Sequence, residues 1–168
     1  GRIATLDKLL KKHKVLRNQI NEPMFAFDSP PLVRAMGHAM WRELVPVLLK
    51  YGADPNIRTK WWAGSFSALD QATDPQAVQM LLEAGASWDV WSASKHGEVD
   101  VLSKLLAETP ELVNAPGGDG QRPLHVAKTV EVAKLLVQNG ADLEVRDIDH
   151  ESTPAMYQID NLPVLRFL

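Results

Sequence analysis

Apolar residues recur at helical spacing along most of the chain, and three of these stripes end in the same way. Apolar positions three and four residues apart predict amphipathic helices, and a glycine directly after such a stripe predicts a helix end with positive φ. Each glycine here is followed by alanine and a short polar turn. The three stripes are VPVLLKYGADPN (45–56), VQMLLEAGASWD (78–89) and VAKLLVQNGADLE (132–144).

A shorter helical start precedes most of these stripes. The pair Thr153 and Pro154 indicates the beginning of a helix, because a Thr hydroxyl can cap a free amide and Pro suits the first helical position. The pattern therefore predicts a repeated unit of helix, tight turn, helix, glycine stop and projecting turn, in an all-α fold. The short starts are TPAMYQ (153–158) and RPLHVA (122–127) and, more weakly, PPLVRA (30–35) and SALDQA (67–72).

The spacing of these features indicates an internal repeat of about 30 residues. Gly52 and Gly85 are 33 residues apart, and the 55 residues between Gly85 and Gly140 leave room for one irregular unit. That unit contains GEVDVLSKLL (97–106), and GRIATLDKLL (1–10) matches it at five of ten positions. A noisy period of this length is typical of helical-repeat arrays.

These residues resemble the ankyrin repeat family over essentially the whole chain. The runs GDGQRPLHVA (118–127), LLKYGADPN (48–56) and LLVQNGADLE (135–144) are similar to its T-P-L-H-x-A helix start and its L-L-x-x-G-A-D-x-N exit. The chain departs from the family where Trp88 to Ala93 replace the helix start. Another departure is the interval of 13 residues both from Ala72 to Gly85 and from Ala127 to Gly140, which predicts a clipped first helix or turn in those two units. The mixture looks like bacterial ankyrin-repeat proteins.

The resemblance implies a solenoid of stacked helix pairs with projecting turns, and a structural role for His125. We expect one array over residues 1–168 that begins and ends within a unit. Terminal repeats need a polar face, so the apolar ending suggests a fragment of a longer protein or ends that are disordered or removed. The expected parts are a partial unit 1–22, units 28–58, 64–89, 88–114 and 119–146, and a partial unit 147–168.

The amino-acid composition limits which partners the chain can be expected to bind and where in the cell it can be expected to act. The chain has 18 basic and 21 acidic residues and no cysteine, which argues against nucleic-acid binding and excludes thiolate chemistry. Its longest stretch without a charge, Trp61–Leu69, has nine residues, far fewer than the ~20 of a membrane helix. We expect no membrane association and a cytoplasmic protein, with a protein delivered to another cell as the alternative.

Residues 146–152 are the one polar cluster that resembles a metal site. Asp147, Asp149, His150 and Glu151 could all supply ligands. The alternative is a projecting turn in which carboxylates accept hydrogen bonds from turn amides. We predict the turn and no metal or cofactor. Because the chain has neither a G-x-S-x-G elbow nor a phosphate-binding loop, we also predict that it is not an enzyme.

The five tryptophans fall into three groups. Trp41 is expected in the core, and Trp88 and Trp91 are expected to pack between neighbouring repeats. Trp61 and Trp62 lie in a connector that is longer than the family's turn. Successive side chains of an extended segment point to opposite sides, so one of this pair is expected to anchor the loop while the other is exposed. Alternatively, both fold back and cover the array.

The leading hypothesis is a non-catalytic protein–protein interaction module that binds another protein through a concave face and its turns. The alternative is the targeting or regulatory part of a larger enzyme or secreted effector. End-to-end self-association of the array is a further possibility. The predicted partner-binding residues are Arg58, Lys60, Trp61 and Trp62 of the long connector, with His38, Lys95, His96 and Gln121.

Overall fold

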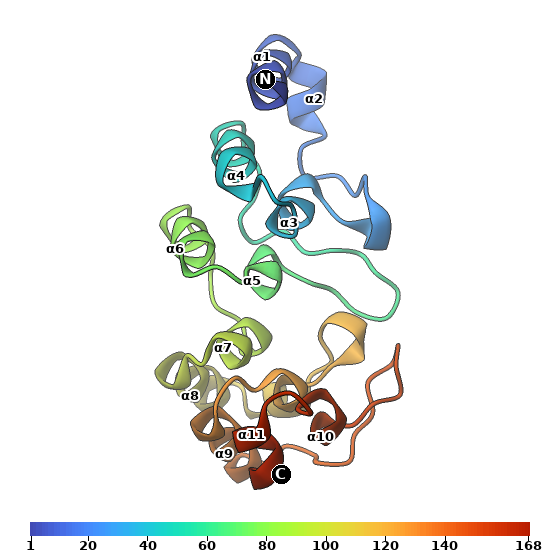
Figure 1. Cartoon of the computed structure of the whole chain (residues 1–168), viewed down its shortest axis with the longest axis vertical. Coiled ribbons are helices and arrows are strands. Elements are labelled where there is room, and N and C mark those ends of the chain that lie inside the picture. The colour runs from blue at the N-terminus through green and yellow to red at the C-terminus, as the bar shows by residue number, and fades with distance from the viewer. The chain divides into compact units, whose positions relative to one another are not determined.

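The computed structural model describes all 168 residues, and its regular secondary structure is entirely helical (Figure 1). The predicted all-α fold of helical repeats is confirmed. The α-helices are α1 (Arg2–Lys12), α2 (Lys14–Asn18), α3 (Pro31–Met36), α4 (Trp41–Lys50), α5 (Ala68–Gln71), α6 (Pro75–Glu83), α7 (Val90–His96), α8 (Val99–Glu108), α9 (Val130–Gln138), α10 (Pro154–Tyr157) and α11 (Leu162–Phe167). The 3-10 helices are η1 (Ala26–Asp28), η2 (Pro110–Asn114), η3 (Gly118–Gly120) and η4 (Pro123–Val126). None of the helices combines the length and the apolar character needed to cross a bilayer.

The chain forms two compact units. The N-terminal unit contains Gly1–Trp61 and Phe66–Ser87, and the C-terminal unit contains Trp62–Ser65 and Trp88–Leu168. The long connector thus contributes its tip, 62–65, to the C-terminal unit. The division of the chain into individual repeats stays a prediction.

In the N-terminal unit, paired helices bury their apolar stripes against each other. Helix α3 packs against α4 and α5, and α1 packs against α2 and α4 (Figure 1). Leu32, Val45 and Leu69 are almost fully buried in this packing. Trp41 begins α4 and is buried, as the sequence predicts.

In the C-terminal unit, α8 packs against α7 and α9, while η4 packs against α7 and α10. The core of this unit includes the buried residues Leu102, Leu124 and Leu136. The two helices for which the sequence predicts clipping are short, and α10 is equally short without such a prediction. Helix α5 and helix η4 have four residues each, whereas α3 has six and α7 has seven.

Three asparagines connect each turn to the turn of the following repeat. Asn56 donates through Nδ2 to the Gly85 carbonyl at 3.0 Å and accepts from the Ser87 amide at 2.8 Å. Asn21 bridges Gly52 and Asp54 in the same way, and Asn114 bridges Gly140 and Asp142. These bridges satisfy backbone groups that the helix ends leave without partners.

The glycine stops and one proline behave as predicted, but one cap does not. Gly85 has φ +95°, and Gly52 and Gly140 are similar. Pro154 occupies the first turn of α10, yet the Thr153 hydroxyl makes no capping hydrogen bond, so that prediction is wrong. Helix α10 has only four residues, and it begins without a side-chain cap.

Candidate partner-binding site

Within the N-terminal unit, the projecting turn 24–29 is joined to the two arms of the long turn, 57–61 and 66–67, through backbone and aromatic contacts. The Lys60 amide donates to the Asp28 carbonyl at 3.3 Å. The rings of Phe27 and Trp61 meet edge to face, with centroids 5.0 Å apart. The long turn is closed on itself because the Thr59 amide donates to the Phe66 carbonyl at 2.9 Å. This turn is therefore held by defined contacts on both of its arms.

Of the predicted site residues in this unit, Arg58 and Trp61 support the turn and Lys60 faces solvent. The Arg58 guanidinium lies 3.2 Å from a carboxylate oxygen of Asp70, which is buried and accepts from the Ser67 amide at 2.7 Å. Trp61 is half-buried beside Phe27, and Lys60 is exposed. Arg58 and Trp61 are thereby committed to holding the loop in place.

His38 follows α3 and is exposed. Its Nδ1 accepts a hydrogen bond from the Met40 amide at 3.0 Å, so the ring takes part in the turn that leads into α4. Its other ring nitrogen is on an exposed side chain. His38 can therefore shape this turn and still contact a partner.

Trp62 is the exposed member of the tryptophan pair. Its side chain is 66% exposed, while Trp61 is half-buried. The chain just beyond it lies close to Gly117, since a Cβ on Gly64 would lie 1.8 Å from the Gly117 carbonyl oxygen. Only glycine fits at this contact between the tip of the long turn and the start of η3. The expectation that one tryptophan anchors the loop and the other is exposed is confirmed.

The remaining predicted site residues lie on α7 and in the loop before η4. Lys95 and His96 end α7 and are half-buried, with the His96 ring 5.4 Å from the Trp88 ring. Gln121 donates through Nε2 to the Tyr157 hydroxyl at 3.1 Å. These residues belong to the C-terminal unit together with Trp62.

The two tryptophans of this unit are used in packing. Trp91 is half-buried against the core of the C-terminal unit and donates through Nε1 to the Ala115 carbonyl at 3.0 Å. Trp88 is half-buried beside His96. The packing expected for Trp91 is confirmed, whereas the contact of Trp88 with His96 lies within the expected unit 88–114.

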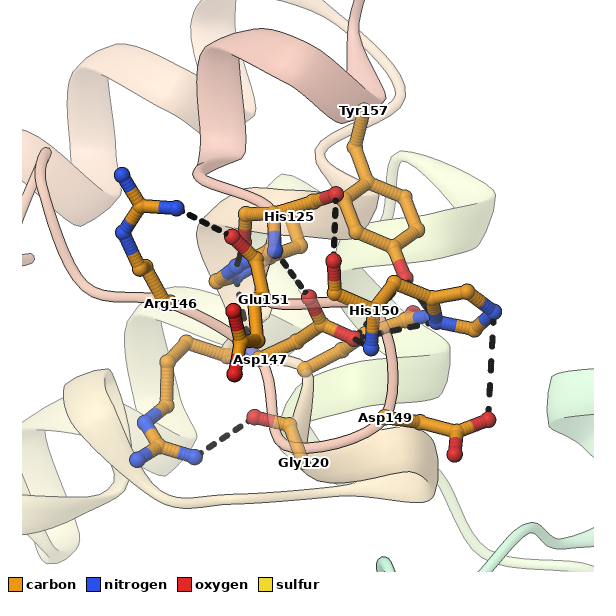
Figure 2. Close-up of polar contacts among 11 residues, drawn as sticks. Gly120, His125, Arg146, Asp147, Asp149, His150, Glu151 and Tyr157 are labelled. Atoms are coloured by element: carbon orange, nitrogen blue, oxygen red, sulfur yellow. Dashed lines mark hydrogen bonds and ion pairs between the residues drawn. The ribbon is translucent and has the colours of Figure 1, made fainter.

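Asp147 organises the projecting turn 146–152 of the C-terminal unit (Figure 2). Its buried carboxylate accepts from the amides of Ser152 at 2.6 Å and His150 at 3.0 Å. The Tyr157 hydroxyl donates to it at 3.1 Å, and His150 Nδ1 lies 3.1 Å from the same oxygen. This arrangement is the turn that the sequence predicts for residues 146–152.

These contacts shift the pKa values of the three groups. Burial raises the pKa of the Asp147 carboxyl, but the hydrogen bonds from Ser152 and His150 outweigh it and leave the pKa below its usual value. The hydrogen bond to Asp147 raises the pKa of His150. Burial, together with the nearby Asp147 charge, raises the pKa of Tyr157 to about 12. The network is thus held by a charged carboxylate and a neutral phenol at neutral pH.

His125 has the structural role that the family resemblance implies. It is buried, its Nδ1 accepts from the Arg122 amide at 3.0 Å, and its Nε2 lies 3.0 Å from the Ser152 carbonyl. Burial lowers its pKa. The neutral ring therefore ties the start of η4 to the turn of the next repeat.

Asp119, Asp149 and His150 are the residues of this region that could hold a metal ion. One ligand atom from each lies within 4.8 Å of the others. His150 Nε2 is 3.8 Å from an Asp149 oxygen (Figure 2). Exposed acidic groups often gather without an ion, so this geometry alone assigns no metal.

The same kind of backbone contact joins two projecting turns within each unit. In the C-terminal unit the Ile148 amide donates to the Asp119 carbonyl at 2.9 Å, just as the Lys60 amide donates to Asp28 in the N-terminal unit. Both accepting residues have positive φ, +55° at Asp119 and +49° at Asp28. Sequence reasoning misses this pairing, because the contacts join residues far apart in the chain, and it also misses the role of Tyr157.

Comparison with known proteins identifies one repeat directly. Residues 119–148 match the family model described as Ankyrin repeat, and the resemblance drawn from the sequence is confirmed there. A search of curated proteins finds no match.

Among solved structures, the chain is similar to one from Bdellovibrio bacteriovorus, described as the predatory endopeptidase Bd0816 in complex with the immunity protein Bd3460. The identity is 21%, the match covers 99% of this chain and 91% of the other, and the TM-score is 0.47. A likeness at this level says nothing about the function of the chain.

Proposed function

We propose that this chain, which carries an ankyrin repeat at residues 119–148, is a non-catalytic module that binds another protein. The repeat is the observation that carries the proposal, because ankyrin repeats are generally interaction units and not enzymes. Helical repeats contact only their neighbours, which leaves their surfaces available for recognition without loss of the core.

The long turn 57–67 supplies the chemistry for partner binding. Trp62 offers a large, rigid aromatic surface to solvent, and tryptophan is enriched among the residues that dominate interface energies. Lys60 is exposed two residues earlier and provides a charge for the polar rim. A tryptophan anchor with a charged neighbour is the composition of a binding hot spot.

The contacts within the turn favour binding because they order it in advance. Arg58 is paired with Asp70, and Trp61 packs on Phe27. A turn that is already ordered loses less conformational entropy when a partner binds. We assign Arg58 and Trp61 to positioning, and Lys60 and Trp62 to direct contact. Further candidate contacts are His38, Lys95, His96 and Gln121.

Affinity capture tests the proposal. The whole chain is immobilised in a lysate of the cells that produce it, beside Trp62→Ala and a matched control, Ile159→Ala. Ile159 is a good control because it is also in the C-terminal unit and is 67% exposed, against 66% for Trp62. We expect one protein to be retained by the wild type and by Ile159→Ala, and to be lost with Trp62→Ala.

The other outcomes are equally informative. If both variants retain the partner, the interaction module stands but Trp62 is not its anchor. If the folded wild-type chain retains no protein specifically, the proposed function is contradicted.

A further inference from the structure

The N-terminal unit contains an open groove with a buried apolar floor and an exposed apolar rim. Its volume is about 480 Å³, and its lining comes from α1 to α4 and the segment between α2 and α3. Leu10 and Leu48 on the floor are buried, whereas Leu16, Met24 and Phe25 are 39%, 50% and 47% exposed. Large apolar side chains gathered around one open hollow mark a site of interaction.

The ionisable side chains that line the groove are basic, and so are most of those on the two helices of one wall. Arg34 and His38 are the ionisable side chains in its lining, and none of the lining residues is acidic. Helices α1 and α2, which form one wall, carry one acidic residue, and that residue, Asp7, is already paired with Lys50 at 2.7 Å. The basic residues of these two helices are Arg2, Lys8, Lys11, Lys12, Lys14 and Arg17.

The shape and lining of the groove favour a helix as the occupant. Its walls are helices, so they offer rows of side chains rather than a sheet edge to which an extended peptide could add. An amphipathic helix places apolar residues three and four positions apart along one face and buries that face in such a groove. Acidic residues beside that face would then meet Arg34.

The same charges argue against a second copy of this chain. A two-fold interface places the same surface of each copy opposite itself. The groove lining, which has Arg34 and no acidic residue, would then meet a second basic lining that offers no carboxylate to pair with Arg34.

We propose that this groove binds an acidic amphipathic helix of a protein partner. This inference rests on the proposed function, since it assumes that the ligand is a protein. It assigns a second binding surface, in addition to the turn that carries Trp62. Leu16, Met24 and Phe25 receive the apolar face of the helix, and Arg34 meets its carboxylates.

The test uses the whole chain and a fluorescent model peptide of about 18 residues, roughly five helical turns. The peptide carries leucine on one helical face and glutamate elsewhere. One control peptide replaces every glutamate by lysine, and another keeps the composition but scrambles the order. Anisotropy titrations at low and high salt give the affinities. We expect the glutamate peptide to bind at least ~10-fold more tightly than either control, and more weakly at high salt.

Two matched variants place the binding in the groove. Leu16→Glu puts a charge into the groove wall, and Val15→Glu puts the same charge one residue away on α2, at a position outside the lining that is 67% exposed. We expect Leu16→Glu to weaken peptide binding ~10-fold more than Val15→Glu does. Circular dichroism confirms that both variants remain folded.

The proposal is overturned if the glutamate peptide does not bind, if the lysine or scrambled peptide binds equally well, or if the two variants behave alike. Binding of an apolar dye that the peptide cannot displace would assign the groove to a small molecule. Self-association that is lost with Leu16→Glu would assign it to a second copy. A partner captured through Trp62 despite failure of the peptide would remove this inference and leave the proposed function intact.

Discussion

Asp147 shows how a single buried carboxylate can hold a projecting turn in place. Its oxygens accept from two backbone amides and the Tyr157 hydroxyl, and contact His150. A buried acceptor that loses its charge leaves donors without adequate partners, at a cost of about 1–3 kcal/mol. The ordinary sequence D-I-D-H-E-S therefore contains one residue on which the local structure depends and others that are exposed.

Replacing Asp147 by Asn tests this role. The side-chain amide would face backbone N–H groups with donors of its own, so we expect the free energy of unfolding to fall by about 2 kcal/mol. The exposed Asp160 provides the control, because Asp160→Asn makes the same chemical change and is expected to have little effect. Urea unfolding measures both. Equal stabilities of the two variants would contradict the assigned role.

The same variant has a defined pH dependence. Asp147 has a lowered pKa, so its contribution to stability is present above about pH 4 and is lost as the pH falls through its folded pKa. His150 has a raised pKa, so its contribution is complete below about pH 6.5 and is lost as the pH rises through its folded pKa.

The stability difference between wild type and Asp147→Asn should therefore be largest between about pH 4 and 6.5. Urea unfolding across this range measures it. Proton NMR of the His150 ring provides an independent check, because its pKa should fall toward the ordinary value in the variant. An unchanged His150 pKa would show that Asp147 does not set it.

For the helices, the sequence predicts where a helix lies and where it ends better than it predicts the length of the helix or its contacts with other segments. The apolar stripes and the glycine stops give α4, α6 and α9 directly, because a 3.6-residue period and a positive φ are local properties. The 3-10 form of η4 and the pairing of projecting turns depend on contacts with other repeats, which no local pattern encodes.

Gly85 tests the importance of the helix stop. Its φ is +95° and a Cβ there would meet no atom within 4 Å, so Gly85→Ala should cost about 1 kcal/mol through backbone strain alone. Gly37, which follows α3 with φ −85°, is the control. Gly37→Ala should leave stability unchanged or slightly increase it. Thermal unfolding of both variants checks this, and equal melting temperatures would contradict it.

For the molecule as a whole, average properties conceal the features that matter for binding. A net charge of −3 suggests no attraction to any class of partner, yet α1 and α2 are strongly basic beside an apolar groove. The exposed Met24, Phe25 and Phe27 stand together in a segment that the repeat pattern treats as a connector. That apolar run is the signal in the sequence that could have indicated the groove.

The predicted binding residues also show what the sequence alone does not reveal. The unusual length of the connector and its adjacent tryptophans single out Trp62, which is exposed. The contacts of Arg58 and Gln121 could not be foreseen, because their partners, Asp70 and Tyr157, are 12 and 36 residues away in the chain. Composition identifies a candidate hot spot, whereas only the fold shows which polar groups are already in use.

The affinity of the purified, captured partner for the chain decides whether this is a binding module with its anchor at Trp62. Isothermal titration calorimetry compares the wild type with Trp62→Ala and Ile159→Ala. We expect Trp62→Ala to raise the dissociation constant about 30-fold, equivalent to about 2 kcal/mol, and Ile159→Ala to leave it unchanged. Equal affinities of the wild type and a folded Trp62→Ala variant would contradict the assignment of the anchor.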